Sequence, residues 1–68
     1  MADATAWIAE HAGELAGLPA EAAAERVREA GLTPRVVPPG SAFTLEFRSA
    51  RVDLHVDADG RVAAVRAG

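Results

Sequence analysis

The sequence has no cysteine, no lysine and no tyrosine, and its 68 residues include one tryptophan and two phenylalanines. Without cysteine, neither a disulfide nor a thiolate metal site can form. A chain of this length buries only about 60% of the surface that its unfolded form exposes, so its core is thin. Small domains often compensate with a disulfide or a structural metal. We therefore expect a single domain over residues 1–68 that is held together by aliphatic packing.

Acidic residues outnumber arginines, which gives a formal net charge of −3 with histidine counted as neutral, and the chain has no lysine. Residues 1–30 carry six acids against two arginines. This balance argues against a nucleic-acid partner, which requires a basic face. No apolar run approaches the roughly 20 residues of a membrane span, so we expect no membrane partner. The chain is expected in the cytoplasm if Met1 is the native start, and in a secreted or periplasmic location if a leader was removed.

Two helices are predicted in the first half of the chain. The first ends near Leu15, because apolar residues recur at helical spacing before it. The second covers residues 20–30, where alanines and a valine form one apolar stripe. Pro19 suits its first turn and Gly31 its C-terminal end.

The second half reads as β-structure. Residues 35–37 form a short strand that a Pro-Pro-Gly sequence ends. Residues 51–57 alternate between apolar and polar side chains, residues 57–60 are a turn signal, and residues 61–65 return, which predicts a β-hairpin.

The segment 40–48, Gly-Ser-Ala-Phe-Thr-Leu-Glu-Phe-Arg, has two interpretations. Periodicity alone favours another strand, with Phe43, Leu45 and Phe47 facing inward. The alternative is an extended loop displayed on the surface. That alternative is supported by Ser49-Ala50, because neither residue readily adopts the positive φ of a tight hairpin turn.

Several motifs resemble the potato type I serine protease inhibitor family, and most closely its short bacterial and fungal branch. Residues 14–17 (E-L-A-G) are similar to the E-L-V-G sequence that enters the helix of that family. Residues 39–48 are similar to its loop pattern P-G-x-x-V-T-M-[DE]-[YF]-R. Residues 51–61 resemble the strand and turn that follow, and residues 66–68 an R-C-G ending. Residues 1–12 lie outside the resemblance and are expected to form an N-terminal helical extension.

The resemblance implies an α+β fold in which a helix packs on a small mixed β-sheet. The strand near Val36 would run parallel to the strand near Leu54, with a reactive loop over residues 40–48 connecting them and a C-terminal β-hairpin following. A hydrophobic core of seven side chains fits this arrangement: Ala23, Val27, Val37, Val52, Leu54, Val56 and Val62.

The resemblance also implies inhibition of a serine protease by substrate-like binding of a rigid loop. The reactive bond would be Leu45–Glu46, and the target would be subtilisin-like, chymotrypsin-like or elastase-like, because Leu45 suits an apolar specificity pocket. The free inhibitor would be a monomer. The loop residues carried over from the family are Ala42, Phe43, Thr44, Leu45, Glu46, Phe47 and Arg48.

In that family, arginines beneath the loop hold it rigid. Arg51 and Arg66 are the matching residues here, and Gly68 closes the matching C-terminal motif. The chain departs from the family pattern at three positions. Asp53 stands where relatives have arginine or asparagine, and an ionised aspartate cannot donate a hydrogen bond. Ala67 replaces a cysteine, and Phe43 replaces a valine.

Other chemistry is weakly supported. His11 and His55 are the only imidazoles, and surface histidines are the simpler interpretation than a metal site. Residues 57–60 begin like a calcium loop but lack the later ligands, so a turn is favoured. No motif pairs a nucleophile with a base, so we expect neither an enzyme nor a cofactor. The alternative function is a non-inhibitory protein-binding module on the same fold.

Overall fold

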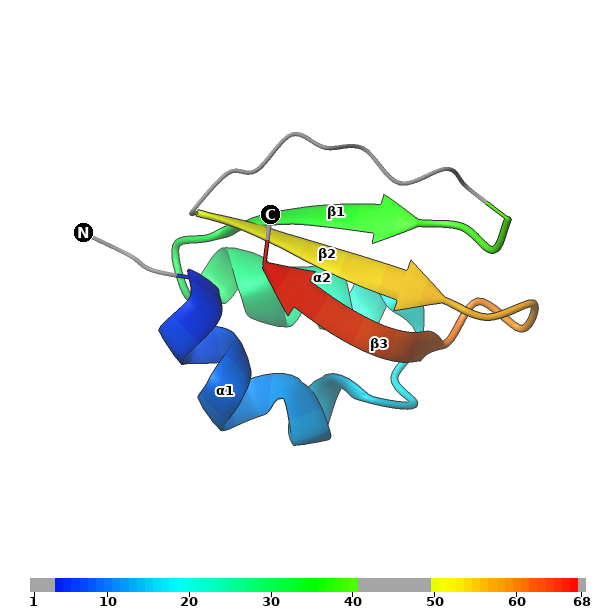
Figure 1. The fold of residues 1–68 in the computed structure, drawn as a ribbon, viewed down its shortest axis with the longest axis horizontal. Helices are drawn as coiled ribbons and strands as arrows, with labels where there is room; N and C mark the ends of the chain where they lie inside the picture. The colour runs from blue at the N-terminus through cyan, green and yellow to red at the C-terminus, as the bar shows by residue number, and fades with distance from the viewer. Residues whose placement is uncertain (1–3, 41–49, 68) are drawn as a thin grey trace.

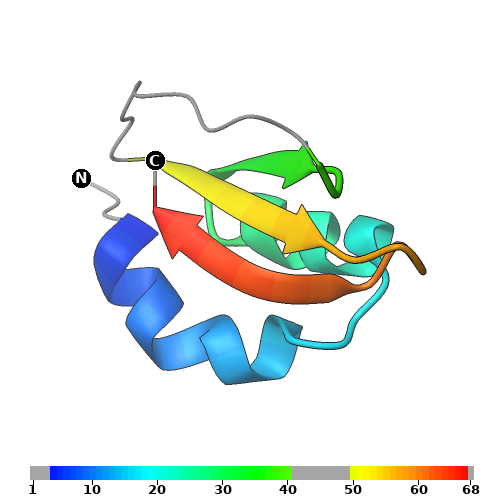
Figure 2. The same cartoon turned by 45° about the vertical axis from the view of Figure 1, so that its right-hand side comes forward.

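The structure is a computed structural model that describes residues 4–40 and 50–67. Its elements follow in the order α1 (Ala4–Leu15), α2 (Ala20–Glu29), β1 (Thr33–Val37), β2 (Arg51–Val56) and β3 (Val62–Ala67). The three strands form one sheet, and both helices lie on the same face of it (Figures 1 and 2). Because each helix has an apolar stripe, this two-layer arrangement buries the helices and one sheet face together.

The second helix begins at the predicted residue and ends one residue before the predicted end, with Ala30 as its C-cap. Pro19 precedes it with extended backbone (ψ 147°), and Gly31 follows it with φ +79°. The backbone N–H of Gly31 donates to the carbonyl of Arg28 at 2.9 Å, which satisfies a carbonyl of the last turn. The left-handed φ of Gly31 turns the chain directly into β1.

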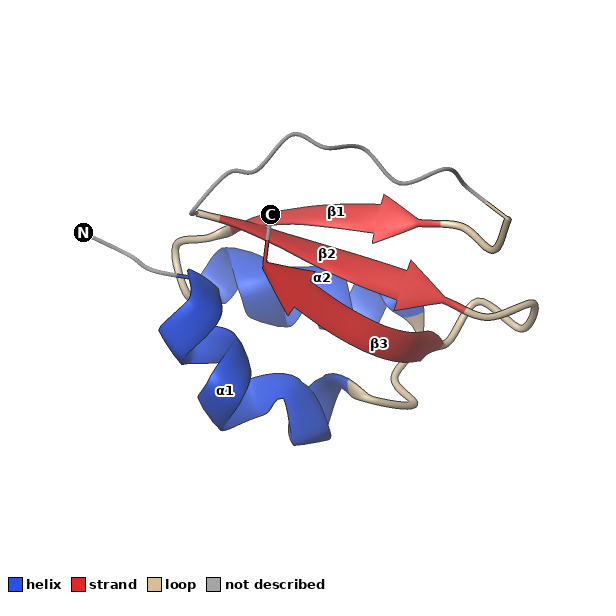
Figure 3. Cartoon of the chain, in the orientation of Figure 1, coloured by secondary structure: helices blue, strands red, loops and turns tan. Residues whose placement is uncertain are grey.

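The sheet is mixed, as the resemblance implied, with the strand order β1-β2-β3. β1 and β2 are parallel, and their register runs from Thr33 opposite Arg51 to Val37 opposite His55. β2 and β3 are antiparallel and form the predicted hairpin. Figure 3 shows α2 behind β1 and β2, and α1 below β3, the strand that it mainly contacts.

The core lies between the helices and the sheet. Its buried cluster comprises Ala4, Leu15, Ala23, Ala24, Val27, Leu32, Val52, Leu54 and Val62. Val37 is also buried but is not part of this cluster. Val56 differs from the prediction because it is only partly buried: the β2–β3 register shifts between His55 and Val56, at the edge of the core.

The connection between the helices is joined to the start of β3. The N–H of Gly17 donates to the carbonyl of Val62, and the N–H of Val62 donates to the carbonyl of Leu18, each at 2.9 Å. The Arg61 guanidinium also donates to the Gly17 carbonyl at 2.9 Å. These bonds fix α1 to the hairpin. No helix within residues 4–40 and 50–67 is long and apolar enough to cross a membrane.

Candidate functional site

The connection from β1 to β2 is where the sequence predicts the reactive loop. Its loop residues, Ala42 to Arg48, lie outside the described residues, as does Gly68. The described flanks are Gly40, with φ +82°, and Ala50. Ala50 is at the beginning of the parallel pair, where its carbonyl accepts the N–H of Thr33 at 2.9 Å. Gly40 follows the far end of β1, so the two flanks lie at opposite ends of the strand pair.

Arg51 is the first residue of β2, directly after Ala50. Its Nε donates to Oδ1 of Asp53 at 3.1 Å. Only 12% of the Arg51 side chain and 16% of the Asp53 side chain are exposed. The two residues are separated by two positions, so they lie on the same face of the strand. Val52 and Leu54 are fully buried on the other face, which puts the ion pair on the side away from the helices.

Asp53 also stands between two other arginines of the sheet. Arg35 of β1 and Arg66 of β3 are both its register partners. Directly opposite residues in neighbouring strands have their side chains on the same face. The sheet face away from the helices therefore carries three arginines around one aspartate, close to the point where the chain enters β2.

This arrangement presents guanidinium groups on a rigid β-framework. Arginine offers five N–H donors in a planar fork and is always charged. Such groups suit carboxylate, hydroxyl or carbonyl acceptors on a neighbouring segment. The role of the aspartate was missed by sequence reasoning, which treated Asp53 only as a lost donor. The spacing of Arg51 and Asp53 on one strand face was the signal that could have revealed the pair.

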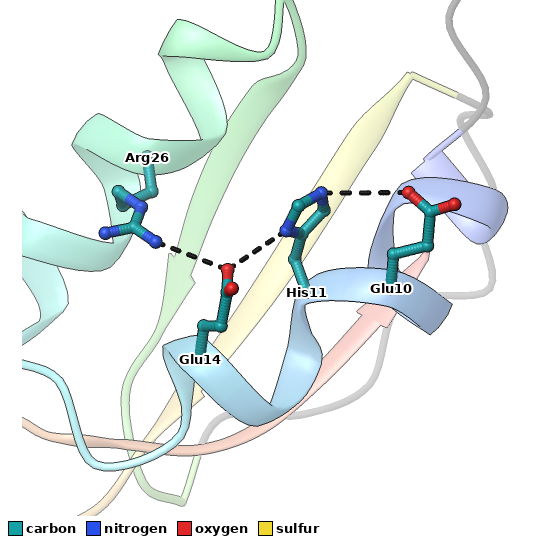
Figure 4. A network of polar contacts seen from close by, with 4 residues as sticks. All are labelled: Glu10, His11, Glu14 and Arg26. Atoms are coloured by element: carbon teal, nitrogen blue, oxygen red, sulfur yellow. Dashed lines mark hydrogen bonds and ion pairs between the residues drawn. The ribbon is translucent and has the colours of Figure 1, made fainter.

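A second polar cluster joins the two helices. Glu14 Oε2 accepts the Nδ1–H of His11 at 3.0 Å and also lies 3.3 Å from the Arg26 guanidinium of α2 (Figure 4). The hydrogen bond from His11, together with the positive charge of Arg26, lowers the pKa of Glu14 below its ordinary value of 4.5. The His11 ring packs on Trp7, with ring centroids 4.8 Å apart. This cluster connects α1 to α2 on the exposed surface of the helices.

The histidines and residues 57–60 were the other candidate sites in the sequence. Within residues 4–40 and 50–67, no three histidine or carboxylate side chains are grouped to hold a metal ion. Residues 57–60 form the predicted turn, in which Oδ1 of Asp57 accepts the backbone N–H groups of Asp59 (2.9 Å) and Arg61 (3.0 Å). That oxygen is occupied within its own turn, as expected for a hairpin.

Comparison with known proteins gives the family. A model described as the peptidase inhibitor I78 family matches residues 7–68. The chain belongs to this peptidase inhibitor family. The match begins at Trp7, within α1, whereas the resemblance found in the sequence began at Glu14. The family is one of inhibitors, so this I78 member is not an enzyme and its partner is a protease.

The fold of this I78 member is similar to that of a solved inhibitor. The crystal structure of bitter gourd trypsin inhibitor superimposes with a TM-score of 0.70 and 27% sequence identity. The match covers 79% of this chain and 82% of the bitter gourd chain. This similarity confirms the potato inhibitor I-like fold that the sequence motifs implied. Among curated proteins, none matches the chain.

Proposed function

We propose that this I78 member inhibits serine proteases by presenting residues 40–48 as a substrate-like loop, with Leu45–Glu46 as the reactive bond. The observation that carries the proposal is the parallel pairing of β1 and β2. It leaves thirteen residues, 38–50, to return from the end of β1 to the start of β2. A connection that returns along the length of two strands favours an extended backbone, which is the form in which proteases bind substrates.

The physical basis is preorganisation. A loop held in the substrate conformation before it binds loses little conformational entropy in the active-site cleft, so it binds tightly. The carbonyl of Leu45 would lie beside the nucleophilic serine and the oxyanion hole. After cleavage, an amine kept in place at Glu46 would attack the acyl-enzyme again before water does. Inhibition of this kind requires a rigid frame on both sides of the bond.

The side chain at the reactive bond decides the target. Leu45 is branched and apolar, so it suits the open hydrophobic pockets of subtilisin-like and chymotrypsin-like enzymes, or an elastase-like pocket that admits it. A trypsin-like pocket, which carries an aspartate at its base, favours a cation instead. The selectivity proposed for this chain therefore differs from the trypsin inhibition for which the bitter gourd protein is named.

The rigid frame is assigned to arginines of the sheet. Arg51 adjoins the described flank of the loop at Ala50, and Arg66 shares the same sheet face through its register with Asp53. Each guanidinium is suited to bind Glu46 or the Thr44 side of the loop by charge-assisted hydrogen bonds. Gly68, at the C-terminal end of the same motif, is the third residue of this support.

The test is titration of a protease panel with the purified chain. Subtilisin, chymotrypsin and elastase should include at least one enzyme that loses activity stoichiometrically, and trypsin should be spared. Mass spectrometry of the complex should then find slow cleavage at Leu45–Glu46 only. A chain that leaves all four enzymes fully active, and still binds a protein partner, would instead be the non-inhibitory binding module.

A further inference from the structure

We infer that Asp53 is a positioning residue of the inhibitory site, because it fixes the Arg51 guanidinium that is proposed to support the reactive loop. This inference rests on the proposed function and deepens it. From sequence alone, Asp53 is a departure that removes a donor from the loop support. In the structure it is the acceptor for Nε of Arg51, 3.1 Å away.

The geometry favours control of orientation. Nε is the guanidinium nitrogen nearest the chain, so a hydrogen bond at Nε sets the plane in which the two terminal nitrogens lie. An unrestrained arginine loses rotamer entropy when it binds. Both side chains are more than four-fifths buried. The bond to Asp53 therefore orders the Arg51 side chain when the protein folds, so less rotamer entropy is lost when Arg51 supports the loop.

The charges on the sheet support the same role. Arg35 and Arg66 are in register with Asp53 on either side, and Arg51 is bonded to it. Arg51 is a diagonal cross-strand neighbour of Arg35 and of Arg66, so without the carboxylate three like charges would share one sheet face with no acid between them. Asp53 thus allows the arginines to remain close together at the entrance to β2.

The competing explanation is an ion pair that stabilises the sheet and nothing more. The two explanations differ in whether binding and cleavage of the loop follow the free energy of unfolding. A purely structural pair would change the free energy of unfolding, with loop cleavage following only as far as the fold loosens. A positioning residue changes cleavage and binding through Arg51, so its effect disappears when Arg51 is already absent.

The experiment compares Asp53→Ala, Asp53→Asn, Arg51→Ala and the double variant Arg51→Ala/Asp53→Ala. The inhibition constant is measured with the panel enzyme that the parent inhibits, and hydrolysis at Leu45–Glu46 is followed by mass spectrometry. Urea unfolding is recorded for each variant. Asp59→Asn is the matched control, because it removes the same charge from the exposed hairpin turn.

Asp53→Ala should bind about tenfold more weakly and be hydrolysed about tenfold faster, the scale of one charge-assisted hydrogen bond after solvent screening. Asp53→Asn keeps an oxygen acceptor for Nε and should recover part of both losses without requiring any repacking. The double variant should behave like Arg51→Ala, and Asp59→Asn like the parent.

Two results overturn the inference in distinguishable ways. If the parent inhibits a protease but Asp53→Ala and Asp53→Asn match its inhibition constant and hydrolysis rate, the positioning role is wrong and the inhibitory function stands. Additive losses in the double variant lead to the same conclusion, because the effect of Asp53 would not pass through Arg51. If the parent inhibits no enzyme of the panel, both the function and the positioning role fail.

Discussion

A guanidinium nitrogen of Arg26 in α2 lies 3.3 Å from Oε2 of Glu14 in α1, so one carboxylate connects two helices through residues twelve positions apart in sequence. The same oxygen accepts the hydrogen bond from His11. The helices otherwise pack mainly on the sheet, with α1 towards β3 and α2 towards β1. The contact between Glu14 and Arg26 therefore holds the two helices together, and its contribution to stability depends on the charge of Glu14.

Glu14 should make stability dependent on pH. Its folded-state pKa lies below the ordinary value of 4.5, so the carboxylate stabilises the fold above that value, and the contribution is lost as pH falls through the lowered pKa. Glu14→Gln should unfold at a lower urea concentration than the parent at pH 6, and the difference should shrink towards zero in strong acid. Glu25→Gln, which removes an exposed acid of α2 outside this cluster, is the control. A difference that persists unchanged in acid would rule out the linkage.

Val27 should be essential to the core, because it is fully buried in α2 against the sheet. Val27→Ala should cost about 1–3 kcal/mol in the free energy of unfolding, from lost apolar burial and the cavity that remains. Urea denaturation measures this cost. Glu25→Ala on the exposed side of the same helix should change stability by less than about 0.5 kcal/mol. Equal costs for the two variants would contradict the assigned buried face.

Asp57 should stabilise the hairpin through its side chain. Its Oδ1 accepts two backbone N–H groups of the turn, so Asp57→Ala should lower the free energy of unfolding by about 1–2 kcal/mol. Asp59→Ala is matched to it, because Asp59 contributes its backbone N–H to this turn and the substitution keeps that bond. Thermal unfolding of the two variants should show the larger loss for Asp57→Ala. Similar melting temperatures would show that the capping bonds contribute little.

Leu45 should determine the target enzyme. Leu45→Lys should shift inhibition towards trypsin, since the specificity pocket would then gain a charge pair. Leu45→Asp should abolish inhibition of the original enzyme, because an ionised carboxylate would enter an apolar pocket. Inhibition constants for the three chains against trypsin and the original target provide the test. Unchanged inhibition by Leu45→Asp would show that the reactive bond lies elsewhere.

Local sequence signals were sufficient for the elements themselves. The apolar stripe of α2 with Pro19 before it and Gly31 after it specifies that helix, because both residues act through their own backbone conformation. The alternation of Val52 and Leu54 with polar residues specifies the buried face of β2 in the same local way. The parallel pairing of β1 with β2 came from the resemblance of the loop motif, since alternation does not encode which strand is the neighbour.

By itself, then, the sequence determined the two helices, the hairpin and the inhibitor family resemblance. Only the tertiary structure decided the partners of the charged side chains. Glu14 meets Arg26 because two helices share one sheet face, and Asp53 lies among three arginines because the strand register aligns them. Charged side chains follow no hydrophobic period, so their contacts depend on packing and register, which arise only when distant segments come together.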